Sequence, residues 1–526
     1  MILGGTMRIR ILAASLASCF LLGARVSGNR IADESEVTRQ VDALLSDAWK
    51  RDSLPVAKRV DDAGFLRRAS LDIRGSIPSS EEVDSFLRET DPEKRRRKID
   101  EMLGEPKYAR HWAALLEIRM IGRDSRRRLI QTYGRDPAAE WLERGLATNR
   151  PYDALVRDLL TAEGVSDQDG EIAFVLRWSD SPANLAGQTS RLFLGIRLQC
   201  AQCHDHPYEK WKQEDFWSMA AYFARVRRTT VTAMDGRNQA VEILEGRRGD
   251  VTIPGTKKKA APRFLEGAAL DPVVPGNRRV ALAERLTDRS NSQFGRALVN
   301  WVWAQFFGRG FVQPVDDFSE TNAPVHADVL ELLTRDFVES GYDLKRLIRI
   351  IAGTEAYQKD SRGEPDRIHF SKGSVRAMTP EQLFRSLAQA TGLEEVVKVR
   401  QKGAPVAVER EMQGALAGFV SRFENDEMSE ILRFELTIPQ TLMMMNGRFN
   451  VDVLPAKAGV LLKILDRFKK PAERIAAMVL SALSRPATEA EQERFQAYLK
   501  LHGDQPAAWI DLYWVLLNSS EFFFNH

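Results

Sequence analysis

Apolar residues recur at helical spacing along most of the chain. Leu344, Leu347, Ile348 and Ile351 follow the order i, i+3, i+4, i+7, which places them on one face of a helix. Start and stop residues frame other segments, as where Thr379 precedes a proline and a glycine follows twelve residues after that. The pattern predicts a mainly α fold, with further helices expected near 79–87, 327–340, 379–392 and 484–503.

One region departs from this pattern. The stretch "TTVTAMDGRNQAVEIL" alternates β-branched and polar residues around Asp235 and Gly236, which indicates a β-hairpin. The following stretch loses periodicity and gains Gly, Pro and Lys. We therefore expect two largely helical domains, separated by a small strand-containing insert and linker. The expected bounds are 35–225 for the first domain, 226–275 for the insert, and 276–526 for the second domain.

The N-terminus has the character of an export signal. Two arginines, Arg8 and Arg10, precede an apolar run from Ile11 to Ala24, and small residues follow. This order is typical of a secretory signal peptide, here residues 1–28, and predicts an exported protein, periplasmic or secreted. "LASC" resembles a lipoprotein box, so a lipid anchor on Cys19 is the alternative to simple cleavage. No later stretch is apolar enough to predict a transmembrane segment.

Composition and charge narrow the class of protein. The chain has 526 residues, of which 44% are hydrophobic and 28% charged, as in ordinary globular proteins. Three of the 76 Lys and Arg residues lie in residues 1–28, which leaves 73 to balance 73 Asp and Glu. The mature chain is thus neutral, and no nucleic acid is expected as a partner. The basic run at 94–98 is expected to be a solvated face.

The stretch "CAQCHDHP" carries the most specific chemistry in the sequence. Cys200, Cys203 and His204 have the Cys-x-x-Cys-His spacing of c-type haem attachment, in which two thiols bind the porphyrin and the histidine binds iron. A covalent haem c is therefore one predicted cofactor. A sixth iron ligand would come from a distant side chain, and the candidates are Met219, His111 and His326.

Two other interpretations of this stretch stay open. Cys200, Cys203, His204 and His206 place four nitrogen or sulfur donors within seven residues, which suits non-haem zinc, iron or copper. In an oxidising compartment the two cysteines could instead form a disulfide. The histidines and Asp205 would then only shape a turn.

A second group of candidate residues lies further along the chain. Asp316 and Asp317 are adjacent, and His326 follows nine residues later. Paired carboxylates near a histidine could form a hydrolytic or metal centre. The same residues are also common in turns and helix caps, which is the more frequent outcome. If they form a centre, it should lie beside the cysteine motif, in a cleft between the two domains.

The chain also resembles a known pair of domains. "FLGIRLQCAQCHDHPYEKWKQEDFWSMAAYFARV", with "KYARHW" and "NRPYDALVRDLLTAEG" before it, is similar to the planctomycete cytochrome C-like domain, domain of unknown function 1549. "NWVWAQFFGRGFVQPVDDFSETNAPVHADVLELL", "GYDLKRLIRIIAGTEAYQ" and "DLYWVLLNSSEFFFNH" resemble the planctomycete secreted domain, domain of unknown function 1553. The resemblance supplies no established activity. Many relatives carry cysteines in a stretch that corresponds to 425–447, where this chain has none.

These observations predict an exported haem- or metal-binding protein of redox or electron-transfer type. Its partner would be a redox protein or an extracellular substrate. One alternative is a non-haem metal protein, either structural or hydrolytic, with polysaccharide breakdown as the activity to expect of the hydrolytic form. The other is a scaffold stapled by a disulfide. Whether the protein is an enzyme is left open by the sequence.

Overall fold

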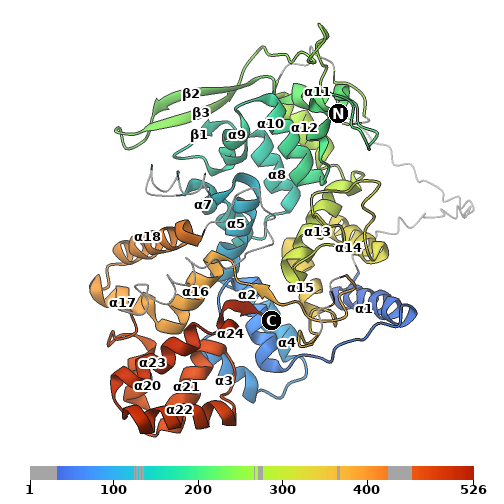
Figure 1. Cartoon of the computed structure of the whole chain (residues 1–526). Coiled ribbons are helices and arrows are strands. Elements are labelled where there is room, and N and C mark those ends of the chain that lie inside the picture. Colours follow the sequence, from blue (N-terminus) through green and yellow to red (C-terminus); the bar gives the residue numbers. More distant parts are fainter. Residues whose placement is uncertain are drawn as a thin grey trace, which may run out of the picture.

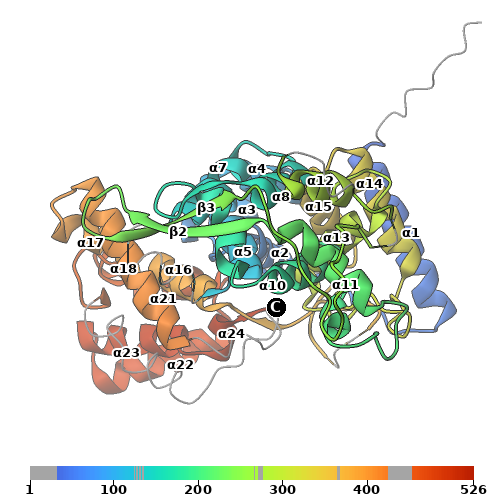
Figure 2. The same ribbon diagram turned by 90° about the horizontal axis from the view of Figure 1, so that it is seen from above.

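The computed structural model describes residues 32–526, apart from residues 124, 126, 127, 129–131, 133–135, 266, 271–275, 364, 365, 367 and 424–452. The predicted signal peptide at 1–28, with Cys19, and the stretch 425–447 lie outside the described residues. The described chain is mainly helical, which confirms the predicted fold class (Figure 1 and Figure 2). No described helix combines the length and the apolar character that crossing a bilayer requires.

The helices of the first half of the chain are short to medium in length. They are α1 Glu34–Arg51, α2 Asp62–Arg74, α3 Ser80–Arg88, α4 Lys94–Gly104, α5 Pro106–Ile121, α7 Pro137–Ala147, α8 Tyr152–Thr161, α9 Ala173–Trp178, α10 Pro182–Thr189 and α11 Gln213–Ala220. Tighter or wider helical turns connect them: η1 Gly170–Ile172, η2 Ser190–Leu194, η3 Leu198–Gln202 and η4 Ala221–Phe223.

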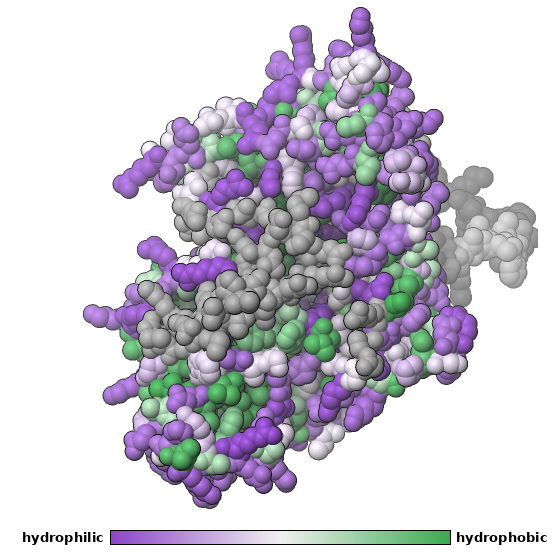
Figure 3. All heavy atoms as spheres, in the orientation of Figure 1, coloured by the Kyte–Doolittle hydropathy of each residue, from purple (hydrophilic) through white to green (hydrophobic). Residues whose placement is uncertain are grey.

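The second half continues with helices. They are α12 Arg278–Leu286, α13 Ser292–Phe307, α14 Ala327–Glu339, α15 Leu344–Gly353, α16 Pro380–Thr391, α17 Leu393–Arg400, α18 Pro405–Phe423, α20 Val460–Arg467, α21 Pro471–Leu483, α22 Glu489–His502, α23 Pro506–Leu517 and α24 Ser520–Phe523. Figure 3 shows apolar side chains on the surface over the C-terminal helices, and Leu501 and Val515 on α22 and α23 are 79% and 49% exposed.

The helix-start residues work as the sequence predicts. Before α16, the Thr379 hydroxyl accepts a hydrogen bond from the Gln382 backbone, and the Gln382 side chain accepts one from the Thr379 backbone. This reciprocal capping box satisfies two donors at the start of the helix. At the other end, Gly392 adopts φ +73°, a left-handed conformation that glycine reaches at little cost.

The predicted hairpin is confirmed. Strands β2 (Val226–Thr232) and β3 (Gln239–Glu245) pair antiparallel, and Gly236 has φ +67° in the turn between them. The short strand β1 (Gly164–Val165) adds to the other edge of β3, so the order is β1-β3-β2. A second small sheet pairs β4 (Arg376–Ala377) with β5 (Phe524–Asn525), near the C-terminus.

Helix α2 connects the two main hydrophobic clusters of the fold. One cluster contains Phe65, Leu66 and Ile73 together with buried residues as distant as Phe370. The other joins Leu71, on the opposite side of α2, to the C-terminal helices. Figure 1 places α2 near the middle of the molecule, beside the C-terminal end of the chain. The division of the chain at 225 and 275 stays a prediction, since residues on both sides of it share the first cluster.

The basic run at 94–98 is not the uniformly solvated face that the sequence suggests. Lys94 is buried, and its ammonium donates to the backbone oxygens of Phe86 and Glu89. It also pairs with Asp62 at 2.6 Å. Lys94 therefore ties α4 to the end of α3 and to α2, because these carbonyls and this carboxylate replace the water that the charge gives up.

A buried carboxylate holds α2 to three other segments. Asp72 accepts hydrogen bonds from the Arg376 guanidinium at 2.8 and 2.9 Å, the Tyr357 hydroxyl at 2.8 Å and the Asn525 amide at 2.8 Å. Burial raises the pKa of Asp72, and the contacts with Arg376 oppose that rise. The partners come from residues 285 to 453 positions away in the sequence.

We expect Asp72→Ala to destabilise the fold by about 3–5 kcal/mol, because it leaves the Arg376 guanidinium buried without its counter-ion. Asp61→Ala, which removes only the N-cap of the same helix, should cost about 1 kcal/mol. Urea unfolding followed by circular dichroism measures both. Equal losses in the two variants would contradict a central role for Asp72.

Candidate functional site

The cysteine motif begins at two short helical turns, one π-helical and one 3-10. The π-helical turn η2 ends at Gly195, which has φ +65°, and a Cβ there would lie 2.6 Å from the ring of Phe318. Only glycine allows both this backbone conformation and this close approach. The 3-10 turn η3 follows, with Leu198 and Ala201 buried, and it carries Cys200 on its exposed side.

Both cysteines of the motif are free and exposed. The backbone between them is held from α11, since the Gln213 side chain donates to the Cys203 oxygen at 2.9 Å. The Trp217 indole donates to the Gln202 oxygen at 3.0 Å, and the Asp205 carboxylate accepts from the Gln213 backbone at 2.9 Å. The loop thus presents two thiols to solvent on a fixed backbone.

The two histidines of the motif have opposite hydrogen-bond roles. His204 is exposed, and its Nδ1 donates to the Asp205 carbonyl at 2.7 Å, which leaves Nε2 with a free lone pair. His206 uses Nδ1 as an acceptor for the backbone N–H groups of Tyr208 and Glu209 at 3.3 and 3.0 Å. A neutral His206 therefore carries its proton on Nε2. His204 thus keeps Nε2 free of hydrogen bonds to the described residues, whereas His206 stabilises the turn.

A pocket of about 400 Å³ opens beside the motif and is shared by two distant parts of the chain. Cys200 and His206 line one side, and Asp317 and Phe318 line the other. The Phe318 backbone donates to the Gly195 oxygen at 2.8 Å, which fixes the second wall against the first. The structure thus brings Asp317 next to the cysteine motif.

Arginines bind the loop of Asp316 and Asp317 to the segment that precedes the motif. Arg197 pairs with Asp316 at 2.8 Å, and Arg191 approaches the same carboxylate at 3.5 Å. Partial burial alone would lower the pKa of Arg197, but the hydrogen bond and charge of Asp316 raise it above its ordinary value. Asp316 therefore serves as an anchor, and Asp317 is the carboxylate that lines the pocket.

The remaining candidates lie elsewhere. His326 does not line the pocket of Asp317; its ring packs on His369 and Phe370. Met219 is fully buried in the first hydrophobic cluster, and His111 is buried beside Gly75. Burial lowers the pKa of His111 to about 3, so this imidazole is neutral. None of the three proposed sixth ligands lines the pocket beside Cys200.

The aromatic residues near the motif divide into two groups. Trp211 and Tyr208 line the pocket, and Tyr208 is 82% exposed. Phe216 and Phe223 are buried in the first hydrophobic cluster, as their helical spacing suggests. Within the described chain, no group of three or more His, Cys, Asp or Glu side chains is arranged to hold a metal ion.

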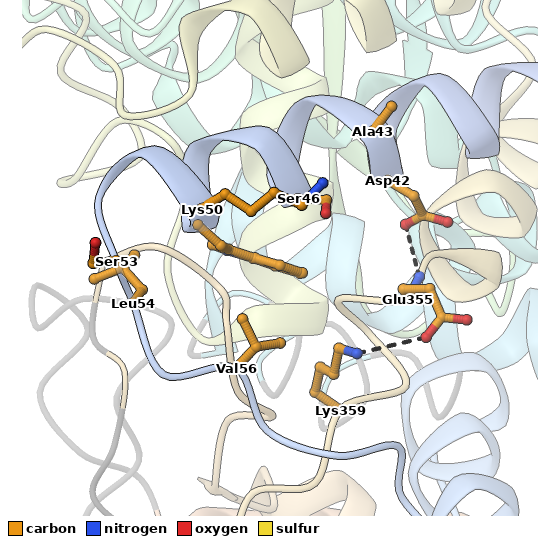
Figure 4. A pocket seen from close by; sticks show the side chains of 10 residues that line it. Asp42, Ala43, Ser46, Lys50, Ser53, Leu54, Val56, Glu355 and Lys359 are labelled. Atoms are coloured by element: carbon orange, nitrogen blue, oxygen red, sulfur yellow. Dashed lines mark hydrogen bonds and ion pairs between the residues drawn. The ribbon is translucent and has the colours of Figure 1, made fainter.

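A second concave site lies between α1 and the turn after α15. A cleft of about 720 Å³ is lined by Asp42 and Lys50 of α1 and by Glu355 and Lys359 from the turn (Figure 4). The Glu355 backbone donates to the Asp42 carboxylate at 2.8 Å, and Lys359 lies 3.7 Å from the Glu355 carboxylate. Burial raises the pKa of Asp42 to about 6, and the charge of Glu355 adds to the rise. The sequence offers no local signal for this site, because its parts lie more than 300 residues apart.

The raised pKa of Asp42 predicts a pH-dependent stability. The fold binds the Asp42 proton more tightly than the unfolded chain does, so its contribution to stability falls as pH rises from about 4 to about 6. Asp42→Asn, which mimics the neutral carboxyl group, should therefore gain stability relative to the parent across this window. Urea unfolding at pH 4, 5, 6 and 7 measures the difference. Asp47→Asn, an exposed position on the same helix, should show no such trend.

The fold and the motif define a class of protein that is mainly helical and has a cysteine-histidine loop near the middle of the chain. Comparison with known families agrees with this class. Residues 40–228 match PSCyt2, a protein of unknown function (DUF1549), and residues 278–499 match PSD1, a protein of unknown function (DUF1553). The chain belongs to the family that carries these two domains in this order. No curated protein and no solved structure matches it.

Proposed function

We propose that this protein is an exported electron-transfer protein that carries a covalent haem c on Cys200 and Cys203. His204 is the protein ligand to iron. The observation that carries the proposal is the His204 ring, whose Nδ1 is bound to the Asp205 carbonyl and whose Nε2 is free. Histidines that bind metals are commonly oriented by such a hydrogen bond to a backbone carbonyl.

The thiols support the same assignment. Both are free and exposed, and the Gln213 and Trp217 side chains fix the backbone that carries them. Haem c needs two accessible thiols and one adjacent imidazole from the protein. When bound, the haem supplies one-electron transfer, and its potential is set by its ligands and its exposure.

The shared pocket is lined by Cys200, but not by Cys203 or His204, and could hold only an edge of the haem. Ile196, Trp211 and Phe318 contribute apolar surface, and Arg197 lies at the side of the pocket. In this arrangement the PSD1 segment contributes one wall of the site through Asp317 and Phe318. The exposed position of the motif supports a cofactor that a redox partner or an extracellular substrate could reach.

Export is part of the proposal. The basic start and apolar run of residues 1–28 support it, as does the requirement of c-type haem attachment for an extracytoplasmic compartment. A lipid on Cys19 would tether the protein to a membrane surface. The balanced charge of the remaining chain gives no support to a nucleic-acid partner.

A non-haem site for zinc, iron or copper is the second candidate, because Cys200, His206 and Asp317 line one pocket. The geometry supports it less well. His206 accepts two backbone hydrogen bonds at Nδ1, so its Nε2 carries a proton and is not free to bind a metal. A metal would need His206 to leave the turn that it now stabilises.

The first test is the haem and metal content of the protein, expressed in a host that attaches c-type haem. We expect a Soret band and an intact mass raised by one covalent haem. Cys200→Ser combined with Cys203→Ser should abolish both without loss of helical circular dichroism, because the two side chains are exposed. His204→Gln should keep the thioether bonds but change the visible spectrum.

His206→Asn is the matched control. Its side-chain oxygen can replace Nδ1 as the acceptor for the backbone of Tyr208 and Glu209, so the spectrum should stay that of the parent. An unmodified mass with one equivalent of zinc, iron or copper would favour the non-haem site. A mass without haem that is two hydrogen atoms below that of the reduced chain would indicate a disulfide-stapled scaffold and would overturn both metal assignments.

A further inference from the structure

Two histidines from distant segments meet outside the cysteine site. His326 lies immediately before α14, and His369 lies in the turn that precedes Phe370. Their ring centroids are 5.6 Å apart, and the rings are nearly perpendicular, at 84°. An imidazole nitrogen binds zinc at about 2.0–2.1 Å, so two rings on one ion have centres roughly 5–6 Å apart. The observed separation is compatible with this geometry, and it is also the separation of an ordinary edge-to-face ring contact.

The His326 ring has an unused nitrogen. Its Nε2 is buried and has no hydrogen-bond partner among the described residues. Buried polar atoms in folded proteins are nearly always paired, so this one calls for a ligand. Burial lowers the pKa of His326, and the neighbouring His369 lowers it further.

The backbone at His326 also adopts an uncommon conformation. Its φ of +48° is left-handed, a conformation that residues other than glycine adopt rarely and at some cost. Such strain persists where the surrounding structure fixes it, and it often accompanies function. Here it directs the chain into α14 with the His326 ring against His369 and Phe370.

Backbone contacts fix the turn that carries His369. The Asp366 carboxylate accepts hydrogen bonds from the backbones of Ile368, His369 and Ser371 at 3.0, 2.9 and 2.6 Å. The Trp49 indole donates to the His369 oxygen at 2.8 Å. None of these contacts involves the His369 imidazole, so the turn is held in place without the ring nitrogens.

The charges around the pair favour a cation. The charges of Asp328 and Asp366 raise the pKa of His326, and the charges of both histidines lower the pKa of Asp52. The charge of Arg51, which pairs with Asp52 at 3.1 Å, lowers the pKa of His326. The charge of Asp366 raises the pKa of Arg309. Three carboxylates therefore lie near the two imidazole rings, and a divalent ion would be attracted by all of them.

We propose that His326 and His369 together bind a divalent transition-metal ion of the zinc and copper type. Each ring supplies one nitrogen, and water fills the remaining positions. Two protein ligands are fewer than a structural zinc site uses, so we expect an exchangeable ion rather than a permanent one. The site is independent of the proposed haem at Cys200 and Cys203.

The test uses the full chain with Cys200→Ser, Cys203→Ser and His204→Gln, so that neither thiol reduces copper and the motif binds none. After dialysis against a chelator, the protein is titrated with Cu²⁺ and followed by electron paramagnetic resonance and thermal unfolding. We expect one bound ion with nitrogen coupling from two imidazoles and a rise in Tm, because ligands that bind only the folded state stabilise it.

His369→Gln should lose this ion and the rise in Tm, and so should His326→Asn, in which asparagine tolerates the left-handed backbone. His502→Gln is the control, since this exposed ring stacks only on Tyr498 in α22. Unchanged copper binding and an unchanged spectrum in His369→Gln would overturn the proposal. If His326→Asn does not fold, His369→Gln decides alone, because its ring takes no part in holding the turn.

Discussion

The fold depends on a buried ion pair between Asp72 and Arg376. Both groups give up water, and the cost is offset only because Tyr357 and Asn525 supply further hydrogen bonds to the same carboxylate. Arg68, one turn earlier on α2, donates to the backbone oxygens of Lys359 and Tyr357. The polar side of α2 thus holds the last residues of the chain, while its apolar side enters the first hydrophobic cluster.

This arrangement explains how one helix can serve two cores. Arg67 reaches the oxygens of Ala482 and Phe522 at 3.2 and 2.9 Å, so the C-terminal helices are bound to α2 by charge-assisted hydrogen bonds. Leu71 packs into their hydrophobic cluster. Separation of the PSCyt2 and PSD1 segments would expose these buried charges, which is a physical reason for the two to form one body.

The local structure was largely predictable, and the long-range structure was not. Thr379 and Gly392 define α16 by chemistry within a few residues of each end, and Gly236 does the same for the hairpin. Arg67, Arg68 and Asp72 carry no local sign of burial, because their partners are hundreds of residues away. Lys94, which is buried although it lies in a basic run, shows the same limit, because its hydrogen-bond acceptors include backbone carbonyl groups that a sequence pattern cannot reveal.

The candidate site was predictable in part for the same reason. The Cys-x-x-Cys-His spacing can be read from the sequence, but the hydrogen bonds of the two histidine rings depend on the conformation of the turn over residues 204–209, which the spacing does not specify. His204 donates through Nδ1, His206 accepts through Nδ1, and the Nε2 of His326 has no described partner. An imidazole whose Nδ1 donates offers a lone pair at Nε2, whereas one whose Nδ1 accepts offers a proton there. The hydrogen bond at Nδ1, more than the position of a histidine in the motif, therefore separates His204 from His206 as a candidate ligand.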